Sequence, residues 1–489
     1  MRPSPQEPID ARAFALGSMG ASLVALVVAG ATLAREPIWG DELGTLGADS
    51  RPFTALLAEL PHGTLYHVAV WPIVAVGGTD AVWLRLPALL AFVGSVVLCA
   101  LVGARLAGRL VGLIAAVLLA LNPFAVQYGQ EGRMYSFDLF FSLLAIWALL
   151  RAVEHPSLVR WLVYSASVTA AVYSHDLALL FIPVHIVLVL LSRTDLWRSF
   201  LLALAAAVVL LLPIELKILA QAESNPFGWI TRPSARSLFN FGVTSTGSRI
   251  GLVLCFIVLA AGCAALVTKV RAGRPLPWPA EAPVFVAAWL LVPVLALFVV
   301  SQVKPLFVDR YLLPTLPALC LGLAMALTLL GRRALLPGAI VLAVAFAVTS
   351  VRNDIAVTNP DWAGVVSHIQ SQRKPGEVEV AIGDTLGNLN SLAYYQRDLG
   401  VDRDQLFWTS AEQDQAPGPL RRLDDLDRAF ETLPAIVADH PGAWLVIRGA
   451  VEPGRLEPVY RFAESCEISK RSSFRGVQLR YVSGCPEAR

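Results

Sequence analysis

The chain has 489 residues, of which 56% are hydrophobic and only 16% are charged, and its formal net charge is +2. Soluble globular proteins average nearer ~25% charged residues, so this composition excludes an ordinary soluble domain. No basic run suggests binding to nucleic acid. Several apolar runs reach the ~20 residues needed to cross hydrocarbon, which predicts a polytopic membrane protein.

The first apolar run, 14–33, follows a polar stretch and is interpreted as an uncleaved membrane span. A cleaved signal peptide is the alternative, although its apolar core would be shorter, about 7 to 15 residues. The apolar runs lack the alternation of barrel strands, so helices are the only suitable spanning element. We predict about eleven spans. They lie at 14–33, 82–103, 110–122, 136–150, 161–173, 177–192, 199–216, 250–268, 282–300, 311–330 and 335–350.

Basic residues predict the orientation, because short cytoplasmic loops are enriched in Lys and Arg. With the N-terminus in the cytoplasm, every short cytoplasmic connection is basic. The basic residues of these connections are Arg105, Arg109, Arg151, Arg160, Arg193, Arg198, Lys269, Arg271, Arg274, Arg332 and Arg333. This pattern requires the short run 65–76, which contains His67 and Pro72, to lie in the membrane interface rather than to span. The C-terminus is then outside the cytoplasm.

Residues 352–489 are predicted to form an extracytoplasmic α/β domain that follows a membrane domain of residues 1–351. Strands are expected at 377–384, 443–449 and 474–482, and helices at 361–372, 391–399 and 423–440. Asp361 stands near the N-cap of the first of these helices. The oxidising location favours a disulfide between Cys466 and Cys485, with two free thiols as the alternative.

The predicted outer loops gather acids and bases beside the hydrocarbon boundary. These loops carry Asp41, Glu42, His62, Gln127, Glu131, Arg133, Tyr135, His175, Asp176, Lys217, Arg232, Arg236, Arg249, Lys304, Asp309 and Arg310. A cation at the interface suits the phosphate of a lipid headgroup. A carboxylate nearby suits removal of a proton from a hydroxyl. Together they predict transfer of a group from a lipid phosphate to an acceptor alcohol.

Purely structural roles remain open for the same residues. Interfacial Lys and Arg commonly extend toward lipid headgroups. Asp41 and Glu42 are also consistent with the first turn of an amphipathic helix, where acids favour the helix dipole. The pair at 175–176 is consistent with a helix start, and the charges at 131 and 133 with a surface ion pair of little energetic value.

Four segments carry a family resemblance through their order and spacing. They are IWGDE at 38–42, HGTLYHVAVWPIVAVGGTDAVWLRLPALL at 62–90, ALNPFAVQYGQEGRMYSF at 120–137 and KPLFVDRYLLPTLPAL at 304–319. The chain resembles the GT-C glycosyltransferases over residues 14–350, specifically the bacterial relatives of the protein O-mannosyltransferase and aminoarabinose transferase group.

This resemblance implies an enzyme in the cell membrane that takes a sugar from a polyprenyl-phosphate carrier. The sugar, mannose or a pentose such as arabinose, would pass to a glycan, lipid or protein acceptor of the cell envelope, outside the cytoplasm. The resemblance implies that Asp41 is the base or the group that orients the acceptor, with Glu42 as its neighbour.

The same resemblance implies substrate-binding roles in three other segments. Glu131, Arg133 and Tyr135 belong to the EGRMY segment. Arg310 of the DRY segment, together with Lys304, is expected near the carrier phosphate, and Tyr311 of the same segment is a further substrate-binding candidate. His62 keeps the polar position of a Lys/His-Pro-Pro-Leu motif whose two prolines are absent here. Some GT-C enzymes use a divalent cation and others do not. Residues 1–351 contain no Asp-x-Asp sequence, so no metal-ligating residues are assigned and a divalent cation stays an open alternative.

Three other function classes compete with this interpretation. A polymerase or ligase of lipid-linked polysaccharide would share most of the chemistry. A transporter or flippase would place ionisable residues near the bilayer midplane, whereas Glu215 lies near the end of its predicted span. A sensor that is merely anchored in the membrane needs only one or two spans.

Overall fold

The computed structural model describes residues 9–49, 52–59, 62–78, 80–220, 230–356, 359–383, 391–392, 394–396, 406–410, 421–422, 433–435, 437–448 and 456–485. Contacts between residues divide the chain into two compact units. The membrane unit comprises Met1–Leu33 and Ala48–Ala356, and the tail unit comprises Ala34–Gly47 and Val357–Arg489.

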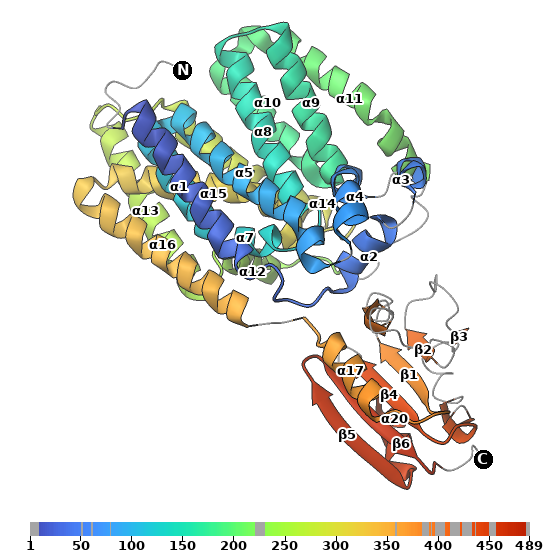
Figure 1. Cartoon of the computed structure of the whole chain (residues 1–489). Coiled ribbons are helices and arrows are strands. Elements are labelled where there is room, and N and C mark those ends of the chain that lie inside the picture. Colours follow the sequence, from blue (N-terminus) through green and yellow to red (C-terminus); the bar gives the residue numbers. More distant parts are fainter. Residues whose placement is uncertain are drawn as a thin grey trace. The chain divides into compact units, whose positions relative to one another are not determined.

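Helices make up the described part of the membrane unit (Figure 1). They are α1 (Ala11–Gly30), α3 (Phe53–Glu59), α4 (Thr64–Gly77), α5 (Ala81–Ala107), α6 (Arg109–Leu121), α7 (Pro123–Gly129), α8 (Tyr135–Glu154), α9 (Leu158–Ser174), η1 (Asp176–Phe181), α10 (Ile182–Ser192), η2 (Thr194–Leu196), α11 (Trp197–Ala220), α12 (Ala235–Ser245), α13 (Arg249–Arg271), α14 (Glu281–Val300), η3 (Asp309–Thr315), α15 (Leu316–Leu329) and α16 (Arg332–Ile355). A further helix, α2 (Gly40–Asp49), crosses the boundary between the units.

Eight helices in the described ranges are long and apolar enough to cross a membrane, which makes the chain a multi-pass membrane protein. A ninth is counted if α6 and α7, bent by 63°, form one broken span. The bend has a local cause, because Pro123 starts α7 and the side chain of Asn122 accepts hydrogen bonds from two nearby amides. The predicted runs 161–173 and 177–192 are helical in α9 and η1–α10, but both fall outside these eight. Helix α4 is likewise a shorter apolar helix.

The centre of the membrane unit is α15, which packs against α6, α13 and α14. In the spanning window that ends in α15, 89% of the residues are buried, against 17% in α13 and in α16. Small residues allow the closest approaches, as is typical of membrane helix pairs. A methyl group added to Gly112 would meet the carbonyl oxygen of Ala100 on α5 at 2.4 Å. One added to Gly262 on α13 would meet Ala326 of α15 at 2.3 Å.

The tail unit contains a mixed six-stranded sheet in the order β3-β2-β1-β4-β6-β5. Its strands are β1 (Val378–Gly383), β2 (Leu406–Ser410), β3 (Arg421–Arg422), β4 (Ala443–Arg448), β5 (Ile468–Phe474) and β6 (Val477–Ser483). The first four are parallel, whereas β6 runs antiparallel to both β4 and β5. The three predicted strands are β1, β4 and β6. Strand β5, which reads ISKRSSF, was missed because its mostly polar, exposed residues show no apolar alternation.

Side chains alternate along each strand, so the sheet of the tail unit has two faces, and one helix packs on each of them. Trp362 and Val365 of α17 (Trp362–Gln372) pack on one face with Trp444, and Val459 of α20 (Glu457–Ser465) packs on the other with Leu445.

Two further predictions for the tail are confirmed. The side chain of Asp361 caps α17 by accepting the amide of Gly364 at 2.9 Å, and Cys466 and Cys485 form a disulfide. The helices predicted at 391–399 and 423–440 lie partly outside the described residues.

Candidate functional site

The guanidinium of Arg310 lies beside two tyrosine rings in the membrane unit. Its Cζ atom is 5.5 Å from the ring centroid of Tyr135, at the start of α8, and 5.9 Å from that of Tyr311. Both rings are buried. Cations within about 6 Å of an aromatic centroid are attracted by the ring quadrupole. The predicted site residues Tyr135, Arg310 and Tyr311 therefore meet, although about 175 residues separate the two ends of this cluster in the chain.

The backbone that carries Arg310 is held in place by buried hydrogen bonds. The indole Nε1 of Trp289 on α14 donates to the carbonyl of Pro314 at 2.9 Å. The hydroxyl of Thr315 donates to the carbonyl of Leu312 at 2.7 Å. The first bond anchors η3 on α14, and the second closes a turn within η3, whose first residues are Asp309 and Arg310.

His175 completes the aromatic cluster. Its ring centroid lies 4.7 Å from that of Tyr311 and 5.7 Å from that of Tyr135, and the side chain is buried. The Nδ1 atom accepts the amide of Leu177 at 3.2 Å, so the proton of a neutral ring resides on Nε2. Within the described ranges this buried Nε2 has no hydrogen-bond partner. The cluster thus contains a donor that a ligand can use.

Burial holds the pKa of His175 well below its ordinary value of 6.5, and electrostatic interaction with His62, Arg133 and Arg310 lowers this pKa further. The imidazole is therefore neutral at pH 7. It contributes a hydrogen-bond donor without adding a charge to a site that already holds two arginines.

His62 joins the same cluster through an ion-pair contact with Asp176. Its Nδ1 lies 2.8 Å from Oδ2 of Asp176, and its ring centroid lies 4.9 Å from that of His175. Asp176 is the first residue of η1 and His175 caps that element, so the sequence-based alternative of a helix start is confirmed. Asp176 therefore both begins η1 and contacts His62, whose ring lies beside His175.

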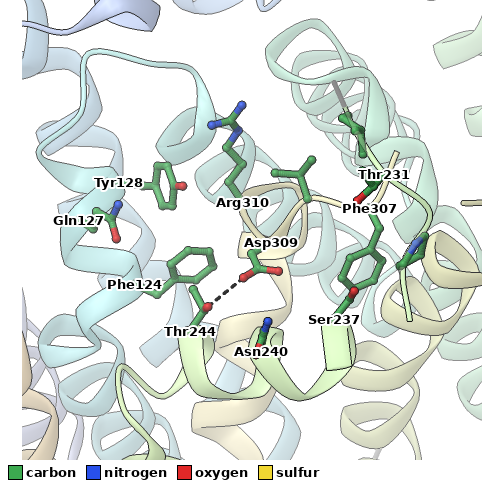
Figure 2. Close-up of a pocket in the computed structure, with 13 residues that line it drawn as sticks. Phe124, Gln127, Tyr128, Thr231, Ser237, Asn240, Thr244, Phe307, Asp309 and Arg310 are labelled. Atoms are coloured by element: carbon green, nitrogen blue, oxygen red, sulfur yellow. Dashed lines mark hydrogen bonds between the residues drawn. The ribbon is translucent and has the colours of Figure 1, made fainter. Parts of the chain in front are cut away.

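A pocket of about 440 Å³ opens beside Arg310 (Figure 2). Its lining residues are Phe124, Gln127, Tyr128, Ile230, Thr231, Pro233, Ser237, Asn240, Thr244, Phe307, Val308, Asp309 and Arg310. Figure 2 shows Thr244 and Asp309 pointing toward each other, and the Thr244 hydroxyl donates to Oδ2 of Asp309 at 2.8 Å. Polar groups and aromatic rings therefore share one cavity.

Helix α12 supplies three polar residues of this pocket that the sequence analysis did not identify. Ser237, Asn240 and Thr244 are spaced by three and four residues, which places them on one face of the helix. Hydroxyl and amide groups are the partners that sugar hydroxyls need. Ser, Asn and Thr are common loop residues, so only their helical spacing could have indicated this face.

Asp41 and Glu42 lie in the first turn of α2, in residues 34–47 that pack with the tail unit. Glu42 is fully buried, and its Oε2 accepts the amide of Trp39 at 3.4 Å, as the third residue of a capped helix does. Asp41 is half-buried. The segment is tied to the tail where the carboxylate of Glu36 accepts the amide of Asn359 at 3.0 Å.

The other predicted residues lie on loops of the membrane unit. Glu131 and Arg133 are in the tight turn between α7 and α8, where the amide of Arg133 donates to the carbonyl of Glu131 at 2.7 Å. Arg133 is close enough to His175 to lower its pKa. Lys304 is exposed in the turn after α14 and does not line the pocket. Among described residues, no group of three or more His, Cys, Asp or Glu side chains could hold a metal ion.

Comparison with known proteins relates this architecture to a family of transferases. Residues 62–215 match the family model "Dolichyl-phosphate-mannose-protein mannosyltransferase". The crystal structure of ArnT from Cupriavidus metallidurans in the apo state is similar at a TM-score of 0.63 and 15% identity, covering 96% of this chain and 98% of ArnT. ArnT bound to undecaprenyl phosphate is similar at a TM-score of 0.61, with the same identity and coverage.

A more distant structural similarity is to an oligosaccharyltransferase from Archaeoglobus fulgidus. The archaeal oligosaccharyltransferase AglB, in complex with an inhibitory peptide and a dolichol-phosphate, has a TM-score of 0.51 and 9% identity. That alignment covers 89% of this chain and 69% of AglB. A search of curated protein sequences finds no match.

Proposed function

We propose that this chain, whose fold is that of the GT-C glycosyltransferases, transfers a sugar from a polyprenyl-phosphate carrier to an acceptor hydroxyl outside the cytoplasm. The sugar is mannose or a pentose such as arabinose, and the acceptor is a glycan, lipid or protein of the cell envelope. The similar ArnT structure contains undecaprenyl phosphate, and the AglB structure contains a dolichol-phosphate, which supports a lipid-phosphate donor.

One observation carries the proposal: Arg310 and the Nε2–H of His175 share an aromatic cluster beside a polar pocket. A guanidinium and a neutral imidazole donor match the oxygens of a phosphate. The apolar surroundings strengthen these interactions, because charges attract more strongly where water is excluded. In this proposal the phosphate of the carrier lies at Arg310, and the sugar lies against the polar face of α12.

The proposed reaction is a single displacement at the anomeric carbon. Asp41 accepts the proton of the acceptor hydroxyl while the hydroxyl oxygen forms the new glycosidic bond. The bond between the anomeric carbon and the phosphate oxygen breaks, and its electron pair stays on the carrier phosphate. Arg310 stabilises the charge that develops there. One displacement inverts the anomeric configuration, and Glu42, which caps α2, holds the backbone next to Asp41.

The decisive test is a transfer assay with a purified polyprenyl-phosphate sugar. Asp41→Asn keeps the size of the side chain but removes the base, so we expect transfer to fall by at least about 100-fold, the lower range for loss of general base catalysis. Asp80→Asn is the matched control, because Asp80 is an exposed acid before α5 whose side chain makes no capping hydrogen bond. Full activity of Asp41→Asn would remove the base assignment.

Arg310 is tested by two substitutions in the same assay. Arg310→Ala should weaken donor binding more than acceptor binding. Arg310→Lys keeps the charge but loses the planar guanidinium beside Tyr135, so we expect an intermediate loss of about 0.5–2 kcal/mol in donor binding. Equal losses for donor and acceptor would assign Arg310 a structural role.

A transporter or flippase and a polymerase or ligase are the alternatives. Proteoliposomes distinguish the first, because a transporter moves solute without forming a covalent product. Mass spectrometry of envelope glycans and glycoproteins from a deletion strain distinguishes the second: loss of one sugar per acceptor supports the transferase, whereas loss of whole chains supports a polymerase or ligase.

A further inference from the structure

A second pocket, of about 290 Å³, lies in the tail unit between α20 and the β5–β6 hairpin. Its walls include Tyr460 and Arg461 from the helix, Arg471 from β5, and Gln478 and Arg480 from β6. Ligand pockets usually measure about 300–1,000 Å³, so this one suits a single sugar-sized molecule. None of its residues belongs to the proposed transferase site.

Arg480 is the central feature of this pocket. Its side chain is only 9% exposed, and its Cζ atom lies 4.6 Å from the ring centroid of Tyr460. The tyrosine is held in place, because its hydroxyl donates to the side-chain oxygen of Gln478 at 3.2 Å. The Nε of Arg480 is buried, and no hydrogen-bond partner for it exists in the described part of the chain. A buried donor of a charged group that lacks a partner is costly.

The neighbouring strand adds a second unfavourable arrangement. Arg471 on β5 is paired directly across the strands with Arg480, so the two side chains are on the same face of the sheet. Like charges directly opposite each other destabilise a strand pair. Arg471 is exposed at the mouth of the pocket.

The acids of the pocket do not balance its arginines. Glu457 contacts Arg461 at 3.2 Å within α20, and Glu464 is the other acid in the lining. Three arginines therefore face two glutamates. The excess positive charge lies on the sheet side, where Arg471 and Arg480 stand together.

We propose that this pocket binds the oxyanion of a small acidic ligand, such as the carboxylate or phosphate group of an acidic sugar. The oxyanion would sit between Arg480 and Arg471, accept the buried Nε–H of Arg480 and neutralise the opposed charges. Planar guanidinium groups are well matched to both carboxylate and phosphate. Gln478 and Tyr460 would meet the uncharged part of the ligand. This binding site does not depend on the proposed transferase activity.

The test is calorimetric titration of the full chain, purified in detergent, with glucuronate and with inorganic phosphate. We expect saturable binding of at least one of them and none of methyl glucoside, which lacks the charge. Binding by glucuronate alone assigns a carboxylate ligand, binding by phosphate alone assigns a phosphate ligand, and binding by both assigns a site for either oxyanion. Arg480→Gln and Arg471→Gln should each weaken the binding at least tenfold.

Two control variants show whether the measured binding belongs to this pocket. Lys470 is an exposed residue next to Arg471 on β5, and its side chain points to the opposite face of the sheet. Lys470→Gln therefore removes a positive charge near the pocket without changing its lining, and should leave binding within twofold. Arg310→Ala should also retain it, because Arg310 belongs to the membrane unit. The exposed Arg471 variant remains informative if Arg480→Gln fails to fold. Absence of saturable oxyanion binding, or unchanged binding in the Arg471 variant, would overturn the proposal.

Discussion

The Nδ1 atom of His62 lies 2.8 Å from Oδ2 of Asp176, and this contact joins two loops that are 114 residues apart in the chain. It ties the segment before α4 to the start of η1, directly beside the buried ring of His175. The pair thus sets the distance between two loops that line the proposed phosphate site.

The strength of the His62–Asp176 pair can be measured with a double-mutant cycle. Because the two side chains are 39% and 28% exposed, we expect a coupling of only about 0.2–1 kcal/mol in thermal unfolding. His62→Ala and Asp176→Asn should each reduce sugar transfer, and the double variant should lose little more than either single one. Additive losses in transfer would show that the two residues act independently.

The hydrogen bond from Thr244 to Asp309 holds α12 against η3 in the pocket. Thr244→Val keeps the shape but removes the hydrogen-bond donor to Asp309, so we expect a loss of about 0.5–1.5 kcal/mol in donor binding, the typical net value of one hydrogen bond. Thr244→Ser retains the hydroxyl and should stay close to the parent affinity. Equal behaviour of the Val and Ser variants in an equilibrium donor-binding assay would contradict this role.

The buried His175 predicts a stability change on mild acidification. Its pKa is lowered in the folded chain by burial first and then by nearby positive charge. The unfolded chain therefore binds more protons between that lowered pKa and 6.5, so stability is complete above pH 6.5 and falls as the pH drops through this window. His175→Asn should flatten that part of the pH profile in thermal unfolding. A profile that keeps its slope without His175 would assign the effect to another group.

The predicted orientation can be checked with a single cysteine. Arg332, at the start of α16, is expected in the cytoplasm, so Arg332→Cys should resist a membrane-impermeant thiol reagent in whole cells and react after lysis. A cysteine in place of the exposed Lys304 should react in whole cells. The reverse pattern would invert the orientation and place the proposed site in the cytoplasm. A background without the exposed Cys263 is needed for a clean result.

Local sequence features were sufficient for the helices and for part of the tail. Long apolar runs, Asp361 at a helix start, apolar alternation in β1 and β6 and the continuous apolar run of β4 can each be recognised from residues close in the chain. The polar edge strand β5 was missed because its side chains are largely exposed. The resemblance to GT-C enzymes likewise came from four short segments and their order along the sequence.

The tertiary structure alone decided which polar residues share a cavity. Arg310 and Tyr135 were named from sequence, but the roles of His175 and Thr244 depend on contacts across long stretches of chain. The pairing of Arg471 with Arg480 similarly depends on the register of two strands. Apolar periodicity determines which faces are buried, whereas distances between distant side chains follow from how whole helices and strands pack. For that reason the sequence by itself identified a membrane transferase candidate, and the packing determined the composition of its pockets.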